Sequence, residues 1–322
     1  MKNQSQTLPR RPAAKRRVSG PRRRHEAVAA LVFLAPLMIG LSAFVLYPLL
    51  ASLYYSFTKW NLVTPAPTWV GLENWRYLTT DPRVGQTLGN TVRFLLTGTS
   101  SYLIVAFLLA LALSASRRGT AFFRGTFLLP WMMSGIAAGA VWTWMFNSRS
   151  GPAAAIIGLL TNQNSNLLLD PAQAMTAIAI ATTWQGAGYG MIIFIAGMNS
   201  ISPELYEAAV IDGANSWHRL RYITVPLLAP TILFLVTTAL IGGFQLYDPV
   251  IAMTSSYDVG GPNGSTRTLV LYLYQQMFEL SEQHSGLGYA SVIAWLLALI
   301  IFSVTLLQWT ITRRGSRRGK GE

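Results

Sequence analysis

Cysteine is absent from the 322 residues and histidine is scarce, with only three. A disulfide framework and a thiolate metal site are therefore excluded. All three histidines, His25, His218 and His284, lie outside the apolar runs. The sequence G-x-x-x-x-G-K-[ST], whose backbone would cradle nucleotide phosphates, is missing as well. We therefore expect a chain that is not an enzyme, holds no metal or cofactor, and depends on another polypeptide for any ATP hydrolysis.

Charged residues are also few, at 11% of the chain against 52% apolar residues. Soluble domains carry roughly 25% charged residues, so this composition is typical of a membrane protein. The formal net charge of +13 raises the alternative of a nucleic-acid partner. We expect none, because the basic residues flank apolar runs and do not form one surface.

Six apolar runs contain no Asp, Glu, Lys, Arg or His. Each is long enough to cross a hydrocarbon core of about 30 Å as a helix, and helices satisfy their own backbone hydrogen bonds in lipid. The sequence therefore predicts an all-α membrane protein with six transmembrane helices, approximately Val28–Ser52, Phe94–Ala115, Thr126–Phe146, Gln173–Ile201, Ile223–Tyr247 and Tyr289–Ile311.

Basic residues predict the orientation of these helices. Residues 1–26 hold nine Lys or Arg with almost no apolar content, which is typical of a disordered tail, and residues 313–322 form a second basic tail. With both tails in the cytosol, 19 of the 25 basic residues lie on the cytosolic side, as the positive-inside rule requires. A cleaved signal peptide is excluded because the first apolar run is too long. Residues 27–312 then form one six-helix domain with both termini cytoplasmic.

A polar segment between the fourth and fifth runs, Pro203–Pro226, is predicted to be a helix, a tight turn and a second helix in the cytosol. Ser202 is a candidate N-cap for the first helix, and Gly213 can end that helix without steric cost. Asn215 or Ser216 can cap the second helix.

The same segment resembles the EAA loop of the membrane subunits of ATP-binding-cassette importers. The matching residues, with Asp212 beside the glycine, are Glu207, Ala208, Ala209, Asp212, Gly213, Ile223 and Pro226. Val225 stands where the family usually has Leu. The resemblance implies a coupling helix that docks on a separate ATPase subunit, where Glu207 meets an Arg. An ordinary polar loop is the alternative.

Two places in the apolar runs are candidate cargo sites. In the fourth run, the residues Trp184, Gln185, Gly186 and Tyr189 resemble the W-x-G-x-x-Y pattern through which maltose-type permeases contact sugar. The glycines here predict a local break in the helix that faces a polar cavity. Helix packing through the glycines is the alternative.

The fifth run ends in IGGFQLYDPV, which combines aromatic rings with amide and carboxylate groups, as a carbohydrate site needs. Gln245 is the preferred ligand and Asp248 a weaker one, since Asp248-Pro249 can instead mark a helix end. The candidate ligands here are Gly243, Phe244, Gln245, Tyr247 and Asp248.

Other segments strengthen the resemblance to permeases of the maltose, lactose and glycerol-phosphate importers. Gly71–Trp75, Asp81-Pro82 and Asn90-Thr91 match a predicted outer loop between the first two spans, and a GGP turn precedes a helix with Tyr274 and Phe278. The resemblance covers nearly the whole chain from about Val28. It implies the type I importer transmembrane fold.

Its implied partners are a second similar permease, two copies of an ATPase, an extracytoplasmic binding protein that delivers a sugar, and the lipid bilayer. The implied location is the plasma membrane of a bacterium, which the chain crosses several times. A glycerol-phosphate cargo is the alternative within the family; it calls for cations near the site, which the spans lack. Outside the family, a stand-alone channel or carrier and a membrane scaffold are the alternatives.

Overall fold

The computed structural model describes residues 21–61, 63–115, 118–161, 166–255, 258–278 and 286–318. The chain forms two compact units, residues 1–52 and residues 53–322. Most of the predicted amino-terminal tail, residues 1–20, and the last four residues lie outside the described part.

The first unit contains α1 (Pro21–Leu41), the π-helical turn η1 (Ser42–Leu46) and the beginning of α2 (Tyr47–Ser56). Its apolar side chains from Val28 onward are exposed, as expected of a helix surrounded by lipid. The helix begins at Pro21, so the last six residues of the predicted basic tail belong to it.

The second unit is helical except for one two-stranded hairpin, in which Thr58 pairs with Trp69 and Lys59 with Thr68. Its first half contains β1 (Thr58–Lys59), β2 (Thr68–Trp69), α3 (Glu73–Thr80), α4 (Pro82–Phe94), η2 (Leu95–Thr99), α5 (Ser100–Leu113), α6 (Thr120–Leu128), η3 (Leu129–Met132), α7 (Gly135–Met145), α8 (Pro152–Thr161) and η4 (Leu167–Leu169). Its second half contains α9 (Ala174–Asn199), α10 (Pro203–Ile211), α11 (Ser216–Arg219), η5 (Leu220–Thr224), α12 (Val225–Leu227), α13 (Ala229–Phe244), α14 (Asp248–Thr254), η6 (Pro262–Gly264), α15 (Leu269–Phe278) and α16 (Leu287–Arg318).

Four helices among the described residues are long and apolar enough to cross a membrane, and two bent pairs raise the number to six if each pair is one span. The straight ones are Val28–Ser56, Pro82–Leu113, Ala174–Asn199 and Leu287–Thr310; the bent pairs are Thr120–Met132 with Gly135–Met145 and Ser216–Leu227 with Ala229–Phe244. All six apolar runs of the sequence are therefore helical, although two of them are not straight.

Both bends have local causes. The third run bends by 100° where η3, which has Pro130 near its start, gives way to α7, which Ser134 caps through its side chain. The fifth run bends by 64° at Leu228, between the prolines Pro226 and Pro230. Proline lacks the backbone donor and crowds the preceding turn, so it interrupts the helical ladder.

Helix α9 is continuous from Ala174 to Asn199, so the predicted break in the fourth run is wrong. Its glycines serve close packing instead. A Cβ on Gly188 would lie 1.9 Å from the backbone oxygen of Phe127, and one on Gly190 would lie 2.8 Å from Ala106. Neighbouring helices thus occupy the space beside each glycine, as is common for helix pairs in lipid.

The second span begins at Pro82, twelve residues before the predicted start at Phe94. Asp81 caps this helix by accepting a hydrogen bond from the Arg83 backbone, and Pro82 takes the first position, where its missing donor costs nothing. The predicted outer loop is therefore largely ordered, as the hairpin, α3 and the first turns of α4.

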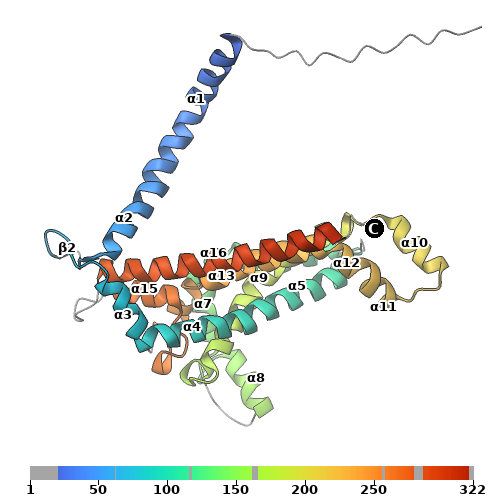
Figure 1. Ribbon diagram of the computed structural model, residues 1–322. Helices are drawn as coiled ribbons and strands as arrows, with labels where there is room; N and C mark the ends of the chain where they lie inside the picture. Colours follow the sequence, from blue (N-terminus) through green and yellow to red (C-terminus); the bar gives the residue numbers. More distant parts are fainter. Residues whose placement is uncertain are drawn as a thin grey trace, which may run out of the picture. The chain divides into compact units, whose positions relative to one another are not determined.

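In the second unit, α10 and α11 lie at one end of the helical bundle, and α3, α15 and the beginning of α4 lie at the other (Figure 1). We call these the α10 end and the α15 end. Helix α16 runs from the α15 end, where it packs against α15 and α3, towards the α10 end.

At the α15 end, the buried carboxylate of Asp81 joins three helices. It accepts hydrogen bonds from the hydroxyl of Tyr272 on α15 and, at 2.7 Å, from that of Tyr289 on α16. Burial by itself would raise the pKa of Asp81, but these two hydroxyls, the Arg83 backbone and the Arg83 guanidinium bring it below its usual value of 3.8. The carboxylate is therefore ionised at neutral pH.

Candidate functional site

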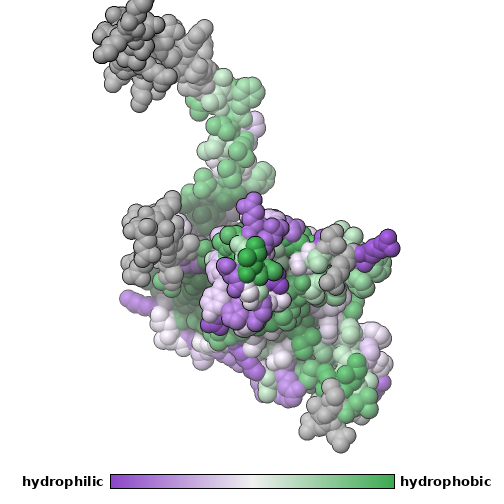
Figure 2. Space-filling view, turned by 90° about the vertical axis from the view of Figure 1, so that its right-hand side faces the viewer, coloured by the Kyte–Doolittle hydropathy of each residue, from purple (hydrophilic) through white to green (hydrophobic). Residues whose placement is uncertain are grey.

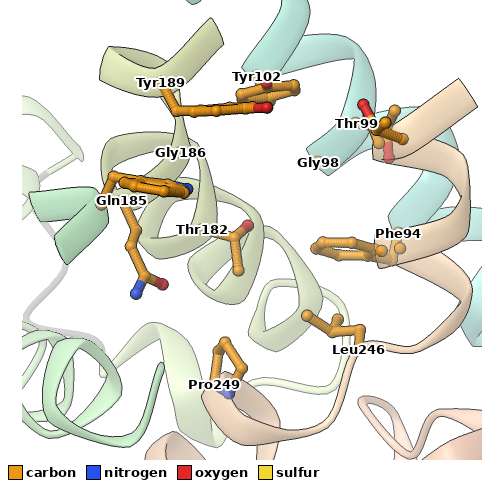
Figure 3. Close-up of a pocket in the computed structure, with 15 residues that line it drawn as sticks. Phe94, Gly98, Thr99, Tyr102, Thr182, Gln185, Gly186, Tyr189, Leu246 and Pro249 are labelled. Carbon is orange, nitrogen blue, oxygen red and sulfur yellow. The ribbon is translucent and has the colours of Figure 1, made fainter. Parts of the chain in front are cut away.

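A cavity of about 330 Å³ lies between α9, α13 and the junction of α4 with α5. Tyr102 and Tyr189 lie at one end of it, and Leu246 and Pro249 at the other, with Thr182 across from Phe94 (Figure 3). None of its 15 lining residues carries a charge: they are Phe94, Gly98, Thr99, Tyr102, Trp131, Thr182, Gln185, Gly186, Tyr189, Thr238, Ala239, Gly242, Gly243, Leu246 and Pro249.

Aromatic rings and hydroxyl groups share the cavity wall. The rings of Trp131 and Tyr189 stack with centroids 4.9 Å apart and planes 13° apart, which fixes both orientations. The Thr182 hydroxyl donates to the Ile178 carbonyl at 2.9 Å, and that of Thr238 to the Phe234 carbonyl at 3.0 Å. Each of these hydroxyl oxygens can still accept a hydrogen bond from a ligand.

Gln185 connects the cavity to the bend of the third span. Its amide Nε2 donates to the Met133 carbonyl at 3.0 Å, at the break between η3 and α7. This bond satisfies a polar group inside the membrane and braces the bend, while the remaining amide hydrogen and the oxygen can meet a ligand.

The predicted helix–turn–helix is confirmed at the α10 end. Gly213 has φ +79°, and two hydrogen bonds close the end of α10: Gly213 N–H donates to Val210 and Ala214 N–H to Ala209. This Schellman arrangement favours glycine at the left-handed position. Asn215 caps α11 by accepting a hydrogen bond from the backbone of His218 at 2.9 Å.

Ser202 holds the N-cap position of α10, but its side chain makes no capping hydrogen bond, unlike the prediction. Pro203 fills the first helical position and has no backbone N–H, so the start of α10 has one donor fewer that needs a hydrogen-bond partner. The loop is held instead by Tyr206, whose hydroxyl lies 3.0 Å from the hydroxyl oxygen of Thr224.

The loop offers both charge and apolar surface to a partner. Glu207 is exposed and makes no ion pair within the described ranges. Figure 2 looks towards this end and shows hydrophilic surface with a small hydrophobic patch within it. The exposed apolar side chains of α10 and α11 are Leu205, Val210, Ile211 and Trp217.

Residues 85–316 match the family described as "Binding-protein-dependent transport system inner membrane component". The chain belongs to this family. It is a permease subunit of an ABC importer, and it crosses the bacterial plasma membrane several times.

Two relatives and one solved structure show what this permease is similar to. It is 33% identical to the lactose transport system permease protein LacF of Rhizobium radiobacter, covering 90% of this chain and 96% of LacF. It is 31% identical to the sn-glycerol-3-phosphate transport system permease protein UgpA of Brucella suis, over 87% of this chain and 93% of the relative.

The fold matches the bacterial alginate ABC transporter, solved in complex with an alginate pentasaccharide-bound periplasmic protein, with a TM-score of 0.76 and 18% identity. That match covers 91% of this chain and 96% of the other. The permease therefore has the type I importer fold.

Four of the eight predicted cargo residues of the permease line the cavity, namely Gln185, Gly186, Tyr189 and Gly243. The other four do not. Phe244 is buried, Gln245 is exposed at the end of α13, and Asp248 is exposed in the first turn of α14. Tyr247 lies against Tyr274, with ring centroids 5.1 Å apart. The alternative interpretation, a helix end at Asp248-Pro249, is not what the structure has, because α13 ends at Phe244 and these two residues begin α14.

Sequence reasoning missed Thr182 on α9 and the cavity residues on the other spans of the permease. The second span has a visible signal, because the polar stretch Thr97–Tyr102 interrupts an otherwise apolar run. Trp131 and Thr238 have no comparable signal, since lone aromatic and Thr residues are frequent in membrane helices. The missed residues with aromatic or polar side chains are Phe94, Thr99, Tyr102, Trp131, Thr182 and Thr238.

Proposed function

We propose that this permease carries a neutral sugar or oligosaccharide, received from an extracytoplasmic binding protein, through the cavity beside α9. The observation that carries the proposal is the path of α9. This one unbroken helix lines the cavity with Thr182, Gln185 and Tyr189 and ends three residues before α10. Cargo and cytosolic partner thus act on the same rigid element.

The proposed topology has six spans, each bent pair counting as one, with both termini in the cytosol. The bias of Lys and Arg towards the predicted cytosolic segments supports it. In this orientation the α10 end is cytosolic and the α15 end faces the binding protein. The basic residues from Arg313 onward then lie on the same side as α10.

The α10 end is proposed to dock on a separate ATPase, of which two copies serve this chain and a second, similar permease. Glu207 is exposed for a cationic partner, and the apolar residues Val210 and Ile211 are 54% and 86% exposed. Such surface on a cytosolic loop fits a protein interface. We assign coupling to the EAA-like residues Glu207, Ala208, Ala209, Asp212, Gly213, Ile223 and Pro226.

The chemistry of the cavity favours neutral cargo. Aromatic rings can stack on the C–H faces of a sugar, while the hydroxyls of Thr99, Thr182 and Thr238 meet its hydroxyl groups. A glycerol-phosphate cargo, as in the name of UgpA, would leave its phosphate without a cation in this cavity. The neutral sugar in the name of LacF fits better.

The proposed mechanism is alternating access driven from outside the chain. ATP closes the ATPase dimer, α10 moves with it, and α9 tilts so that the cavity changes the side to which it opens. The two states must differ in their contacts with ATPase or cargo for this coupling to work.

Reconstitution tests the proposal. The permease, its partner permease and the ATPase are placed in liposomes with internal ATP, and sugar uptake is measured with the binding protein outside. We expect Glu207→Gln to lower uptake by roughly tenfold or more, since a charge-assisted hydrogen bond contributes about 1.5–3 kcal/mol. Glu204→Gln, one turn earlier on α10, is the matched control.

Uptake by liposomes that contain this permease alone, without ATPase or nucleotide, would show a stand-alone carrier. Full uptake by Glu207→Gln would remove this residue from the coupling contact.

A further inference from the structure

A second cavity, of about 370 Å³, lies at the α15 end and shares no lining residue with the first. Its wall is polar, unlike that of the cavity beside α9. Two guanidinium groups, two amides and two aromatic rings line it: Arg83, Arg267, Tyr272, Gln275, Gln276 and Phe278. Guanidinium and amide groups together suit an anionic oxygen ligand.

Arg267 is held in place by the glycine-rich loop that precedes it. A Cβ on Gly260 would lie 3.1 Å from the Arg267 Cβ, and one on Gly264 would lie 3.2 Å from its Nη1. Both glycines have positive φ, of +101° and +68°, so the backbone wraps closely around the arginine side chain. The Arg267 backbone is fixed too, because Asn90 Nδ2 donates to its carbonyl at 3.0 Å.

The two arginines differ in their charge balance. Arg83 Nε lies 3.4 Å from the Asp81 carboxylate, and its guanidinium lies over the ring of Tyr272. Arg267 has no carboxylate within ion-pair distance among the described residues, and its buried Nε makes no hydrogen bond there. A buried donor on a cation is costly to leave unsatisfied, so the cavity is suited to receive a carboxylate.

We propose that this cavity receives an acidic side chain of the extracytoplasmic binding protein. The inference rests on the proposed function, which places the α15 end outside the membrane. A binding protein must contact that face, and a carboxylate on the binding protein would supply the negatively charged partner that is missing beside the Arg267 guanidinium. Phe278 is 57% exposed and gives the partner an apolar contact beside the charged group.

The test measures stimulated ATPase activity of the complete reconstituted complex against the concentration of the purified solute-binding protein from the same transport system. We expect Arg267→Gln to raise the half-saturating concentration roughly tenfold or more at an unchanged maximal rate, because binding is weakened and turnover is not. Arg76→Gln, an exposed arginine on α3, is the matched control and keeps the wild-type curve.

Arg267→Lys keeps the charge without the planar fork, and we expect an intermediate shift. An intermediate shift in Arg267→Lys, together with an unchanged basal ATPase rate in both variants, would show that the effect of Arg267→Gln does not come from misfolding. A wild-type curve for Arg267→Gln overturns the inference while the proposed function stands. A wild-type complex that the binding protein does not stimulate overturns both.

The source of the carboxylate is tested with glucuronate, an acidic sugar, in the absence of binding protein. If glucuronate binds to the wild-type complex and not to the Arg267→Gln complex, the cavity is assigned to a small acidic ligand and the proposal is overturned. No glucuronate binding, together with the shifted curve, supports an acidic side chain of the partner.

Discussion

The two ends of the second unit are stabilised in different ways. At the α15 end, side chains bond to groups far away in sequence: Asn90 donates to the carbonyls of Gly264 and Arg267, and Asp81 joins Tyr272 and Tyr289. At the α10 end the hydrogen bonds stay within the loop, as in the cap formed by Asn215 and the contact between Tyr206 and Thr224, and polar side chains remain exposed.

This difference shows which end is held together by bonds between distant parts of the chain. The α15 end forms a fixed platform, although the hydroxyls of Ser265 and Thr266 and the Nε of Arg267 lie buried there without a hydrogen-bond partner among the described residues. The α10 end keeps its charge and apolar surface for a partner. Substitutions at the α15 end should therefore reduce stability, and those at the α10 end should reduce transport.

Asp81→Ala gives the largest expected loss of stability. It leaves the hydroxyls of Tyr272 and Tyr289 buried without their acceptor, which costs about 1–3 kcal/mol for each group. We expect a clearly lower melting temperature in nanodiscs. Asp258→Asn, an exposed acid at the same end, is the control and should melt like the wild type. A melting temperature of Asp81→Ala equal to that of the wild type would show that the carboxylate does not stabilise the contact between these helices.

Acid should reduce the stabilisation that the Asp81 carboxylate provides. The folded pKa of Asp81 is below its usual value, so its stabilisation is complete above pH of about 4 and is lost as pH falls through the folded pKa. We expect the difference in melting temperature between wild type and Asp81→Asn to stay constant above pH of about 4 and to shrink as pH falls below it. A difference that stays constant down to about pH 3 would contradict a lowered pKa of Asp81.

Asn90→Ala should have a smaller, local effect. Two hydrogen bonds from α4 to the loop before α15 disappear, each contributing about 0.5–1.5 kcal/mol. We expect faster amide hydrogen exchange in residues 260–267, while exchange in α9 stays unchanged. Gln86→Ala, which removes a single bond to the Asn263 carbonyl, is the matched comparison and should loosen the loop less.

Gly213→Ala should affect stability least, although it strains the turn. A left-handed residue with a Cβ costs about 1–2 kcal/mol, but Gly213 is exposed and the strain can relax by fraying of α10. We expect an unchanged melting temperature and reduced ATP-driven uptake. Gly125→Ala is a control in α6, away from the cavity, where a Cβ meets nothing within 4 Å. Wild-type uptake by Gly213→Ala would separate the turn from coupling.

Much of the fold could be predicted from the sequence because lipid imposes long uncharged helices. The six runs and the turn at Gly213 follow from that constraint and from glycine stereochemistry. The bends at Met133 and Leu228 could not be predicted, because a proline near a helix end can begin a helix as well as interrupt one. The unbroken α9 depends on neighbours such as Phe127, which lie far away in sequence.

The candidate cavity could be predicted only on the helix that carries the strongest motif. Gln185, Gly186 and Tyr189 lie on one face of α9 and line the cavity together. Gln245 follows Gly243 by two residues, and the end of α13 between them turns its side chain away. A sequence shows which residues are chemically suitable, but the point at which a helix ends determines which of them meet.

Helix α9 is unbroken from Ala174 to Asn199, so a tilt at one end of the helix displaces side chains further along it. Tyr189 and Asn199 are separated by about 15 Å of helix, so tilting this helix by roughly 10° about its Asn199 end would carry the tyrosine sideways by about 3 Å. That displacement is comparable to the thickness of an aromatic ring. In the proposed mechanism, a small tilt at the Asn199 end would therefore be enough to separate the Tyr189 ring from that of Trp131 and change access to the cavity.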